Sequence, residues 1–281
     1  MLNVLEVIRK TSEFFASKGV ESPRLNAELL VSHALALGRM ELYLQFERPV
    51  TDPELAAIRE LVRRRGRREP LQYVLGFTEF CGMRLRTDRR ALIPRPETEL
   101  LVETIVARCG APPGRILDLG TGGGAIALAL ARAFPEAAVT AVDRSAEALS
   151  LAAENMASTG LSGRVALVES DWFGGLPGGA LFDLIVSNPP YLSEAEVEAT
   201  APEVRDHEPH PALASGSGGF SDIARIVPAS AGFLAPGGMI ALETGTGHHA
   251  QAAGAARAAG FSRSESVRDL TGRDRIFLAW R

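Results

Sequence analysis

The stretch ILDLGTGGGAIALALA, residues 116–131, decides how this sequence folds. An apolar run of strand length leads into a turn in which four of five residues are glycine, and a helix-length run of Ala, Ile and Leu follows. Glycine lets the backbone turn sharply and lets a ligand approach without meeting a Cβ atom. The stretch therefore predicts a strand, a ligand-binding turn and a helix, which together form the first unit of a parallel α/β sheet.

The same order of elements continues towards the end of the chain. Because strand–helix–strand repeats build a parallel sheet with helices on both faces, residues from about 97 onward predict an α/β, Rossmann-like domain. Its ligands should gather at the carboxyl ends of the strands, near the switch point of the sheet. The predicted strands are 115–120, 137–143, 164–170, 181–188, 238–244 and 275–281, and the predicted helices are 97–109, 125–134, 146–159 and 250–260.

The residues before this domain follow a different pattern. Over 1–75, apolar residues recur at helical spacing, and Thr51 with Glu54 forms a capping box at the start of one helix. Residues 76–96 include a short alternation of apolar and charged residues that predicts a β-hairpin. The sequence thus predicts three parts: a small all-α bundle over 1–75, a linking hairpin over 76–96, and the α/β domain over 97–281.

The composition is that of an ordinary globular protein, with 46% hydrophobic and 23% charged residues. No apolar run approaches the ~20 residues that span a bilayer, and the N-terminus lacks the pattern of a secretory signal. Cys81 and Cys109 are the only cysteines, too few for a disulfide framework or a thiolate zinc site. We therefore expect a cytoplasmic protein with no membrane partner and no metal.

Charge is distributed unevenly along the chain. The net charge is −4, but residues 1–75 are net positive and the remainder is net negative. An acidic catalytic half argues against a duplex nucleic-acid substrate, which normally binds to a basic face. The arginine run at 63–68 could contact RNA or an acidic partner, although we favour the interpretation that it is a solvated helix end. We expect no obligatory nucleic-acid partner and a monomer.

The glycine turn has two candidate ligands, a nicotinamide dinucleotide and S-adenosylmethionine. Asp143 ends the next predicted strand and can accept hydrogen bonds from both ribose hydroxyls of a nucleoside. A nicotinamide-binding turn would read GxGxxG, whereas this turn reads GTGGG after Asp118, and DLGTGGG resembles motif I of the class I S-adenosylmethionine-dependent methyltransferases. One strand further on, Asp171 can accept from an adenine amino group and Trp172 can lie against the ring, although Trp172 could instead be a core aromatic residue.

The predicted strand 181–188 runs into SNPPY, residues 187–191, a corner that suits methyl transfer to a planar nitrogen. Such a nitrogen is a poor nucleophile because its lone pair is delocalised, and a site that accepts both of its N–H bonds can hold it in place. Asn188 offers a side-chain oxygen, Pro189 offers a carbonyl and no N–H, and Tyr191 offers a stacking face. The other interpretation is a proline-stiffened loop without chemistry.

Longer stretches, spread from residue 69 to residue 275, resemble a single known family. They are EPLQYVLGFTEFCGMRL (69–85), ALIPRPETELLVE (91–103), ILDLGTGGGAIALALA (116–131), AVDRSAEALSLAAEN (141–155), SDWF (170–173), SNPPY (187–191), RDHEPHPALASG (205–216) and DLTGRDR (269–275). Together they resemble the release factor glutamine methyltransferase family (PrmC/HemK). The resemblance implies a class I methyltransferase fold with a mostly parallel seven-stranded sheet, a five-helix N-terminal domain that helps to grip the substrate, and a linking hairpin.

The resemblance also implies an activity. The methyl donor would be S-adenosyl-L-methionine, with S-adenosyl-L-homocysteine as product, and the acceptor would be the side-chain amide of the glutamine in the Gly-Gly-Gln loop of bacterial class 1 peptide release factors. Asn188, Pro189 and Tyr191 are the expected catalytic residues, and Pro190 joins them in binding the substrate glutamine. The expected cofactor-binding residues are Gly120, Thr121, Gly122, Gly123, Gly124, Asp143, Asp171, Trp172 and Asn188.

Two features leave alternatives open. In IPRPETE, the residues Arg95, Glu97 and Thr98 either close over the methionine end of the cofactor or simply begin a helix. The turn departs from the family's frequent GTGTG at Gly123, where only a side chain is lost.

Other activities also stay open. The alternative enzyme methylates an exocyclic amine of ribosomal RNA or DNA, since NPPY occurs in such methyltransferases too. A nicotinamide-dependent protein and a catalytically silent binding module are further alternatives. The histidines indicate no metal site: His207 and His210 are expected to shape a loop, and His248 and His249 to be surface residues at a helix start.

Overall fold

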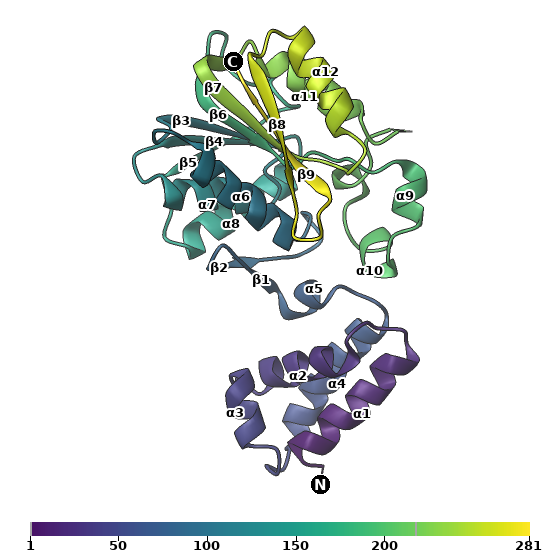
Figure 1. The fold of residues 1–281 in the computed structure, drawn as a ribbon. Helices are drawn as coiled ribbons and strands as arrows, with labels where there is room; N and C mark the ends of the chain where they lie inside the picture. Colours follow the sequence, from purple (N-terminus) through teal and green to yellow (C-terminus); the bar gives the residue numbers. More distant parts are fainter. Residues whose placement is uncertain (1, 217) are drawn as a thin grey trace. The chain divides into compact units, whose positions relative to one another are not determined.

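The computed structural model describes residues 2–216 and 218–281, and the chain separates into two compact units. One unit runs up to Gly76 and takes in Ala201–His207 from much later in the chain. The other unit holds Phe77–Thr200 and Glu208–Arg281, so the β-hairpin belongs with the α/β domain. Figure 1 shows the elements of each unit.

The helical unit is a bundle around one apolar core. Phe15, Leu30 and Ile58, from three different helices, are almost fully buried in it. At the start of α4 the Glu54 carboxylate accepts from the Thr51 backbone N–H at 2.9 Å, which satisfies a group that the helix itself leaves unpaired. The helices of this unit are α1 (Val4–Ser17), α2 (Pro23–Ala34), α3 (Arg39–Leu44), α4 (Asp52–Gly66), α5 (Leu71–Leu75) and the short α10 (Pro202–Arg205).

Part of the arginine run holds α10 within this unit. Glu203 accepts from Arg65 at 2.9 Å through one carboxylate oxygen and from Arg68 at 2.6 Å through the other. The Arg65 side chain is buried and also donates to Asn26 at 2.8 Å. The interpretation of the run as a solvated helix end is therefore wrong for these two arginines, because both are bound to a carboxylate 135 or more residues away in the sequence.

The α/β unit is built on a seven-stranded sheet with the order β5-β4-β3-β6-β7-β9-β8. The first five of these strands are parallel neighbours, and β9 pairs antiparallel with both β7 and β8. The mostly parallel α/β fold predicted from the sequence is thereby confirmed, with its switch point at β3, between β4 and β6. The strands are β3 (Arg115–Leu119), β4 (Ala138–Asp143), β5 (Val165–Glu169), β6 (Phe182–Ser187), β7 (Leu234–Glu243), β8 (Arg263–Arg268) and β9 (Asp274–Trp280).

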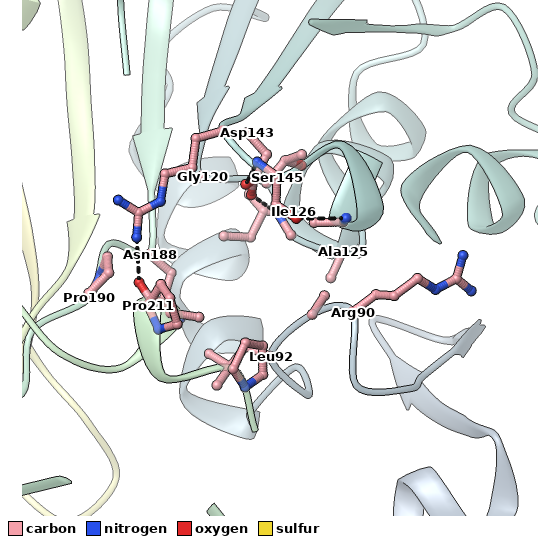
Figure 2. A pocket seen from close by; sticks show the side chains of 18 of the residues that line it. Arg90, Leu92, Gly120, Ala125, Ile126, Asp143, Ser145, Asn188, Pro190 and Pro211 are labelled. Atoms are coloured by element: carbon pink, nitrogen blue, oxygen red, sulfur yellow. Dashed lines mark hydrogen bonds between the residues drawn. The ribbon is translucent and has the colours of Figure 1, made fainter. Parts of the chain in front are cut away.

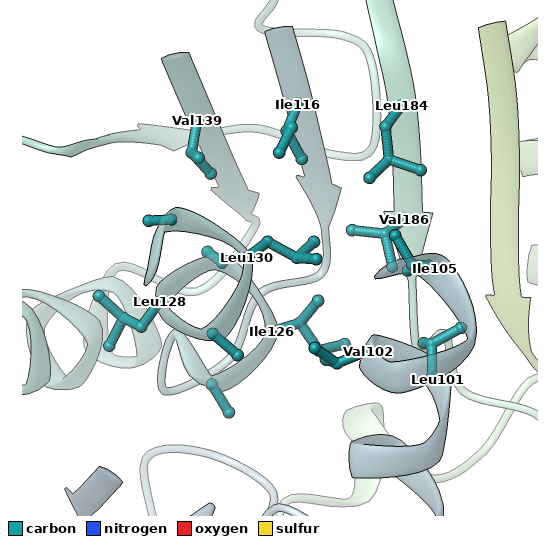
Figure 3. Packing of buried hydrophobic residues seen from close by; sticks show 14 of the residues in the cluster. Leu101, Val102, Ile105, Ile116, Ile126, Leu128, Leu130, Val139, Leu184 and Val186 are labelled. Carbon is teal, nitrogen blue, oxygen red and sulfur yellow. The ribbon is translucent and has the colours of Figure 1, made fainter. Parts of the chain in front are cut away.

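Helices cover both faces of this sheet. On one face Leu101 and Leu130 pack against Ile116 and Leu184 of the central strands (Figure 3). A second buried cluster on the other face includes Ile226. Among the described residues no helix combines the length and apolar character needed to cross a membrane. The covering helices are α6 (Pro96–Arg108), α7 (Ala125–Ala133) and α8 (Ala146–Ser158) on the first face, and α11 (Ser221–Ser230) and α12 (His249–Ala258) on the second.

The hairpin of β1 (Phe77–Phe80) and β2 (Met83–Arg86) packs into the first of these clusters, through Phe80 and Leu85. One α8 side chain ties it to the glycine turn. Asn155 accepts from the Arg86 N–H at 2.7 Å and donates to the Gly123 carbonyl at 2.9 Å. The hairpin therefore supports the turn from behind.

Several elements were not predicted from the sequence. β8 is an edge strand of sequence RSESVR, which pairs with β9 through its backbone and has no apolar pattern to reveal it. α11 contains Pro228, a residue that usually breaks a helix interior, so its sequence does not indicate a helix. α9 (Glu194–Glu198) and the 3-10 turn η1 (His210–Ala212) are too short to give a periodic signal.

Replacing Glu203 with alanine should destabilise the helical unit, because the buried Arg65 guanidinium loses its carboxylate. Breaking a buried ion pair from one side costs about 3 kcal/mol, and the partial exposure of Glu203 reduces the expected loss to about 2 kcal/mol. Amide hydrogen exchange in α2 and α4 should accelerate accordingly. Glu13→Ala, at an exposed position on α1, is the matched control. Equal exchange rates in the two variants would contradict the role assigned to Glu203.

Candidate active site

A pocket of about 440 Å³ lies at the carboxyl ends of β3, β4 and β6. β3 leads into Gly120, β4 ends at Asp143 and β6 leads into Asn188, and all three residues line the pocket (Figure 2). Leu119 and Ser187 are partners in the β3–β6 ladder, and the Ser187 hydroxyl donates to the Leu119 carbonyl at 2.7 Å. This register places the glycine turn beside the SNPPY corner, where ligands of such sheets bind.

The glycine turn depends on the absence of side chains at specific positions. Gly120 has φ +69°, and a Cβ there would lie 3.3 Å from the Trp172 ring. Gly124 has φ +86°, and a Cβ there would lie 3.2 Å from the Ala152 Cβ. Both positions combine a left-handed backbone with a close neighbour, so neither accepts a side chain without strain. At Gly123 the closest contact of a Cβ would be 3.4 Å, from Leu151, which is ordinary van der Waals spacing.

Asp143 anchors this turn from the neighbouring strand. Its Oδ2 accepts from the Gly122 N–H at 2.8 Å, and its Oδ1 accepts from the Ser145 N–H at 2.9 Å. Each carboxylate oxygen has a second lone pair, so these bonds leave acceptor capacity at the pocket wall.

Asp118 holds the turn from beneath and is fully buried. Its Oδ2 accepts from the Thr121 hydroxyl at 2.6 Å and from the Ala127 N–H at 3.1 Å, while its Oδ1 has no hydrogen-bond partner among the described residues. Burial, with a smaller contribution from the Asp143 charge, raises the pKa of Asp118 to about 7. Asp118 therefore keeps its proton to a higher pH than an exposed aspartate does.

Trp172 and Asp171 both line the pocket, and the Trp172 ring also packs against the second buried cluster of the sheet. The Trp172 backbone has φ +52°, an uncommon value for a residue with a side chain, and its carbonyl accepts from the Ser170 hydroxyl at 2.8 Å. This conformation sets the indole against Gly120. Asp171 is largely exposed and pairs with Arg225 at 2.9 Å, so only part of its acceptor capacity faces the pocket.

The SNPPY corner is held by a short network of hydrogen bonds. The Asn188 Nδ2 donates to the Thr98 hydroxyl at 3.2 Å, and the Thr98 hydroxyl donates to Glu243 at 2.7 Å. The Tyr191 hydroxyl donates to the other oxygen of Glu243 at 3.0 Å. Burial and the nearby Glu243 charge raise the pKa of Tyr191, so its hydroxyl stays protonated at neutral pH.

Comparison with known proteins assigns this chain to a family. The family model of the PrmC N-terminal domain matches residues 6–76, and that of the methyltransferase small domain matches residues 96–205. The release factor glutamine methyltransferase of Geobacter sulfurreducens is 44% identical over 97% of this chain and 95% of its own length. The enzyme of the same name from Deinococcus radiodurans is 42% identical over 100% and 99% of the two chains. This chain belongs to the release factor glutamine methyltransferase family.

Solved structures share the fold of this family member at low sequence identity. The T. thermophilus 16S rRNA N2 G1207 methyltransferase (RsmC), in complex with AdoMet and guanosine, has a TM-score of 0.53 at 21% identity, over 73% of this chain and 49% of its own. A methyltransferase from Pyrococcus furiosus has a TM-score of 0.51 at 20% identity, over 71% and 89% of the two chains. These likenesses concern the methyltransferase fold alone.

The structure brings together most of the residues expected at the site of this methyltransferase. Gly124, Pro189 and Tyr191 are the exceptions, because they do not line the pocket: Gly124 is the N-cap of α7, Pro189 is buried, and Tyr191 points its hydroxyl at Glu243. The expected residues on the pocket wall are Gly120, Thr121, Gly122, Gly123, Asp143, Asp171, Trp172, Asn188 and Pro190.

Two proline-rich loops form another part of the wall. Leu92 and Pro94 come from the IPRPETE loop, and Pro211 comes from the DHEPHP loop. Arg95 and Glu208 join these loops through an ion pair of 2.5 Å, and the Glu208 side chain is only 1% exposed. Arg95 thus binds a partner loop, which neither sequence interpretation of IPRPETE had included.

The histidines give one confirmed position and one correction. His210 lies in the loop as expected, where its Nε2 is 3.0 Å from Glu194. His249 is not a surface residue: it is buried, with its ring nitrogens 2.8 Å from the hydroxyls of Thr244 and Ser266. Its ring also packs edge-on against Phe277 of β9, so it lies on the face of α12 that meets the sheet. No cluster of three possible metal ligands occurs among the described residues.

Sequence reasoning missed Glu243, which connects Thr98 with Tyr191. One signal was available, because GMIALET places a single carboxylate at the end of an otherwise apolar strand. Such a group is rarely buried unless it has partners. Its partners come from 52 and 145 residues away, so no local pattern could identify them.

The raised pKa of Asp118 predicts a pH dependence of stability. In the unfolded chain this carboxyl loses its proton near the usual 3.8, but in the folded protein it does so near 7. The folded state thus binds more protons between these values, and the free energy of unfolding falls as the pH rises through them. Asp118→Asn should remove this component. Between pH 5 and pH 7.5 the free energy of unfolding of the variant, relative to that of the unsubstituted protein, should therefore rise by more than about 1 kcal/mol.

Urea unfolding followed by tryptophan fluorescence measures this difference, since both tryptophans lie in the α/β unit. The ligand-free protein should be used, so that binding does not contribute to stability. Parallel pH profiles for the two proteins would contradict the assignment of the raised pKa to Asp118.

Proposed function

We propose that this chain transfers a methyl group from S-adenosyl-L-methionine to the side-chain amide nitrogen of the glutamine in the Gly-Gly-Gln loop of bacterial class 1 peptide release factors. The observation that carries this proposal is the position of Asn188, on the wall of a pocket that also holds the glycine turn. Membership of the release factor glutamine methyltransferase family supports the choice of acceptor.

The pocket residues fit S-adenosylmethionine. The side-chain-free turn at Gly120 leaves room for close approach of a ligand, and Trp172 adds an aromatic wall beside it. Asp143 would accept from the ribose hydroxyls with its remaining lone pairs, and Asp171 would accept from the adenine amino group. S-Adenosylmethionine, when bound, supplies an electrophilic methyl group on a sulfonium centre.

The corner residues would prepare the acceptor nitrogen. The Asn188 Oδ1 and the Pro189 carbonyl would each accept one N–H of the glutamine amide, which holds the nitrogen in place and favours the form with an available lone pair. Pro190 would shape the wall against which the side chain lies. Tyr191, fixed through its hydroxyl, would present its ring to the flat amide. No strong base is required, because the alkylated nitrogen is acidic and releases its proton to water.

We also propose roles for the rest of the chain. Residues 1–75 would contact the release factor, and residues 76–96 would link them to the catalytic residues 97–281. The protein would act in the cytoplasm as a monomer and without nucleic acid. These proposals are supported by the match of residues 6–76 to the PrmC N-terminal domain and by the excess of acidic residues after residue 75.

Mass spectrometry of a purified release factor, incubated with the protein and S-adenosylmethionine, tests the proposed reaction. We expect one added methyl group on the Gly-Gly-Gln glutamine and no product when that glutamine is replaced by glutamate. Asn188→Ala should lower kcat by at least about 100-fold, because the loss of one preorganised polar group at a reacting centre has that size. Methyl transfer to ribosomal RNA or DNA, with none to the factor, would overturn the choice of substrate.

A pair of glycine variants tests the binding site. Gly120→Ala should weaken binding of S-adenosylhomocysteine by at least about tenfold, since the left-handed backbone and the Trp172 ring both oppose a Cβ atom. Gly123→Ala is the matched variant in the same turn, where a Cβ meets ordinary spacing, and it should cost less than about threefold. Isothermal titration calorimetry measures both affinities. A reversed order of the two losses would contradict the assigned geometry.

A further inference from the structure

We propose that Glu243 and Thr98 are positioning residues that hold the Asn188 amide with its oxygen towards the pocket. The inference rests on the proposed function, because it concerns how Asn188 accepts a bond from the substrate amide. It begins from a continuous path of hydrogen bonds from Glu243 through Thr98 to Asn188, which we call the Glu243–Thr98 relay.

The direction of each bond in the relay follows from the chemistry of the groups. The single hydroxyl proton of Thr98 is donated to Glu243 over 2.7 Å. The Thr98 oxygen then has only lone pairs to offer to Asn188, and it lies 3.2 Å from the Asn188 amide nitrogen. The NH₂ of Asn188 is therefore bound to Thr98, and its Oδ1 is the group left for the pocket.

The opposite orientation of the Asn188 amide would prevent it from accepting a hydrogen bond from the substrate amide. A flipped Asn188 would place its oxygen against a Thr98 oxygen that has no proton to give, and it would turn its NH₂ towards the pocket. The substrate amide also presents N–H groups, so two sets of donors would then face each other. The two orientations of an asparagine amide differ little in shape, which means that only the hydrogen-bond partners can choose between them.

The buried position of Glu243 is compensated by polar groups at the SNPPY corner. It is 1% exposed at the end of β7, where an ionised carboxylate loses its hydration. Burial raises the pKa of Glu243 above its usual value, and the bonds from Thr98 and Tyr191, together with the Arg275 charge, offset only part of this rise. The polar partners that compensate its burial are thus mainly two hydroxyl groups, each adjoining the SNPPY corner or belonging to it.

Both carboxylate oxygens of Glu243 help to hold the SNPPY corner. One oxygen orients Asn188 through Thr98, and the other binds the Tyr191 hydroxyl at 3.0 Å. Since Glu243 ends β7, where it pairs with Ile276 of β9, it sets the two corner side chains relative to the sheet and to each other. This preorganisation is what a site needs when its polar groups must meet a weak nucleophile.

The decisive test compares two substitutions at Thr98. Thr98→Val keeps the shape and removes the hydroxyl, so the relay is broken, whereas Thr98→Ser keeps the hydroxyl and removes the methyl group. We expect Thr98→Val to lower kcat by about 10- to 100-fold with binding of S-adenosylhomocysteine changed less than about threefold. Thr98→Ser should recover most of that loss. A role in packing alone predicts the reverse order, and that result would overturn the proposal.

Thr104→Val is the matched control for this pair, because Thr104 is buried on the same helix and lies outside the pocket. It should leave kcat unchanged. A double-variant cycle with Glu243→Gln adds a test of coupling. If the two residues act through one relay, the double variant should have a kcat no more than about threefold below that of Thr98→Val alone. Losses that multiply would show that Glu243 and Thr98 act independently.

A spectroscopic measurement separates failure of the relay from failure of the proposed function. The Asn188 side-chain NH₂ signals, identified by their loss in Asn188→Ala, should shift in Thr98→Val and stay in place in Thr98→Ser. This readout needs no methyl transfer. If the unsubstituted protein leaves release factors unmodified, the proposed function fails while these signals still test the relay. Signals unmoved by Thr98→Val would overturn the relay whatever the substrate.

Discussion

The site depends on the register of β3 against β6. Leu119 pairs with Ser187 at the carboxyl ends of these strands, and the Ser187 hydroxyl closes the pairing by donating to the Leu119 carbonyl. The residues that follow on each strand, Gly120 and Asn188, are therefore neighbours on one pocket wall. A shift of one residue would exchange the faces of every side chain in β6 and move Asn188 away from the glycine turn.

Three buried carboxylates hold the loops that surround the pocket. Asp118 holds the glycine turn through Thr121, Glu208 joins the two proline-rich loops through Arg95, and Glu243 holds the SNPPY corner. Each is costly to bury, and each is bound to the polar groups of a loop that shapes the pocket. Asp118 and Glu243 lie at the carboxyl ends of β3 and β7, and Glu208 lies in a loop, so the loops around the pocket are fixed by buried carboxyl groups from three separate parts of the α/β unit.

The sequence predicted what local patterns can encode. The alternation of strands and helices, the glycine turn and the position of Asn188 after a buried strand all follow from short-range periodicity and residue type. The partners of Glu243 and Glu203 lie more than 50 residues away, so only the folded chain reveals them. The strand β8 was not predicted because an edge strand needs no apolar face. The burial of His249 was not predicted because a helix start gives no indication of which side is buried.

The central claim is that Asn188 binds the acceptor amide at this pocket. A crystal structure of the protein with S-adenosylhomocysteine and a peptide containing Gly-Gly-Gln tests it most directly. We expect the Asn188 Oδ1 within about 3 Å of the glutamine amide nitrogen, with the Asn188 NH₂ still bound to Thr98. A glutamine amide bound elsewhere, or more than about 5 Å from Asn188, would contradict the claim.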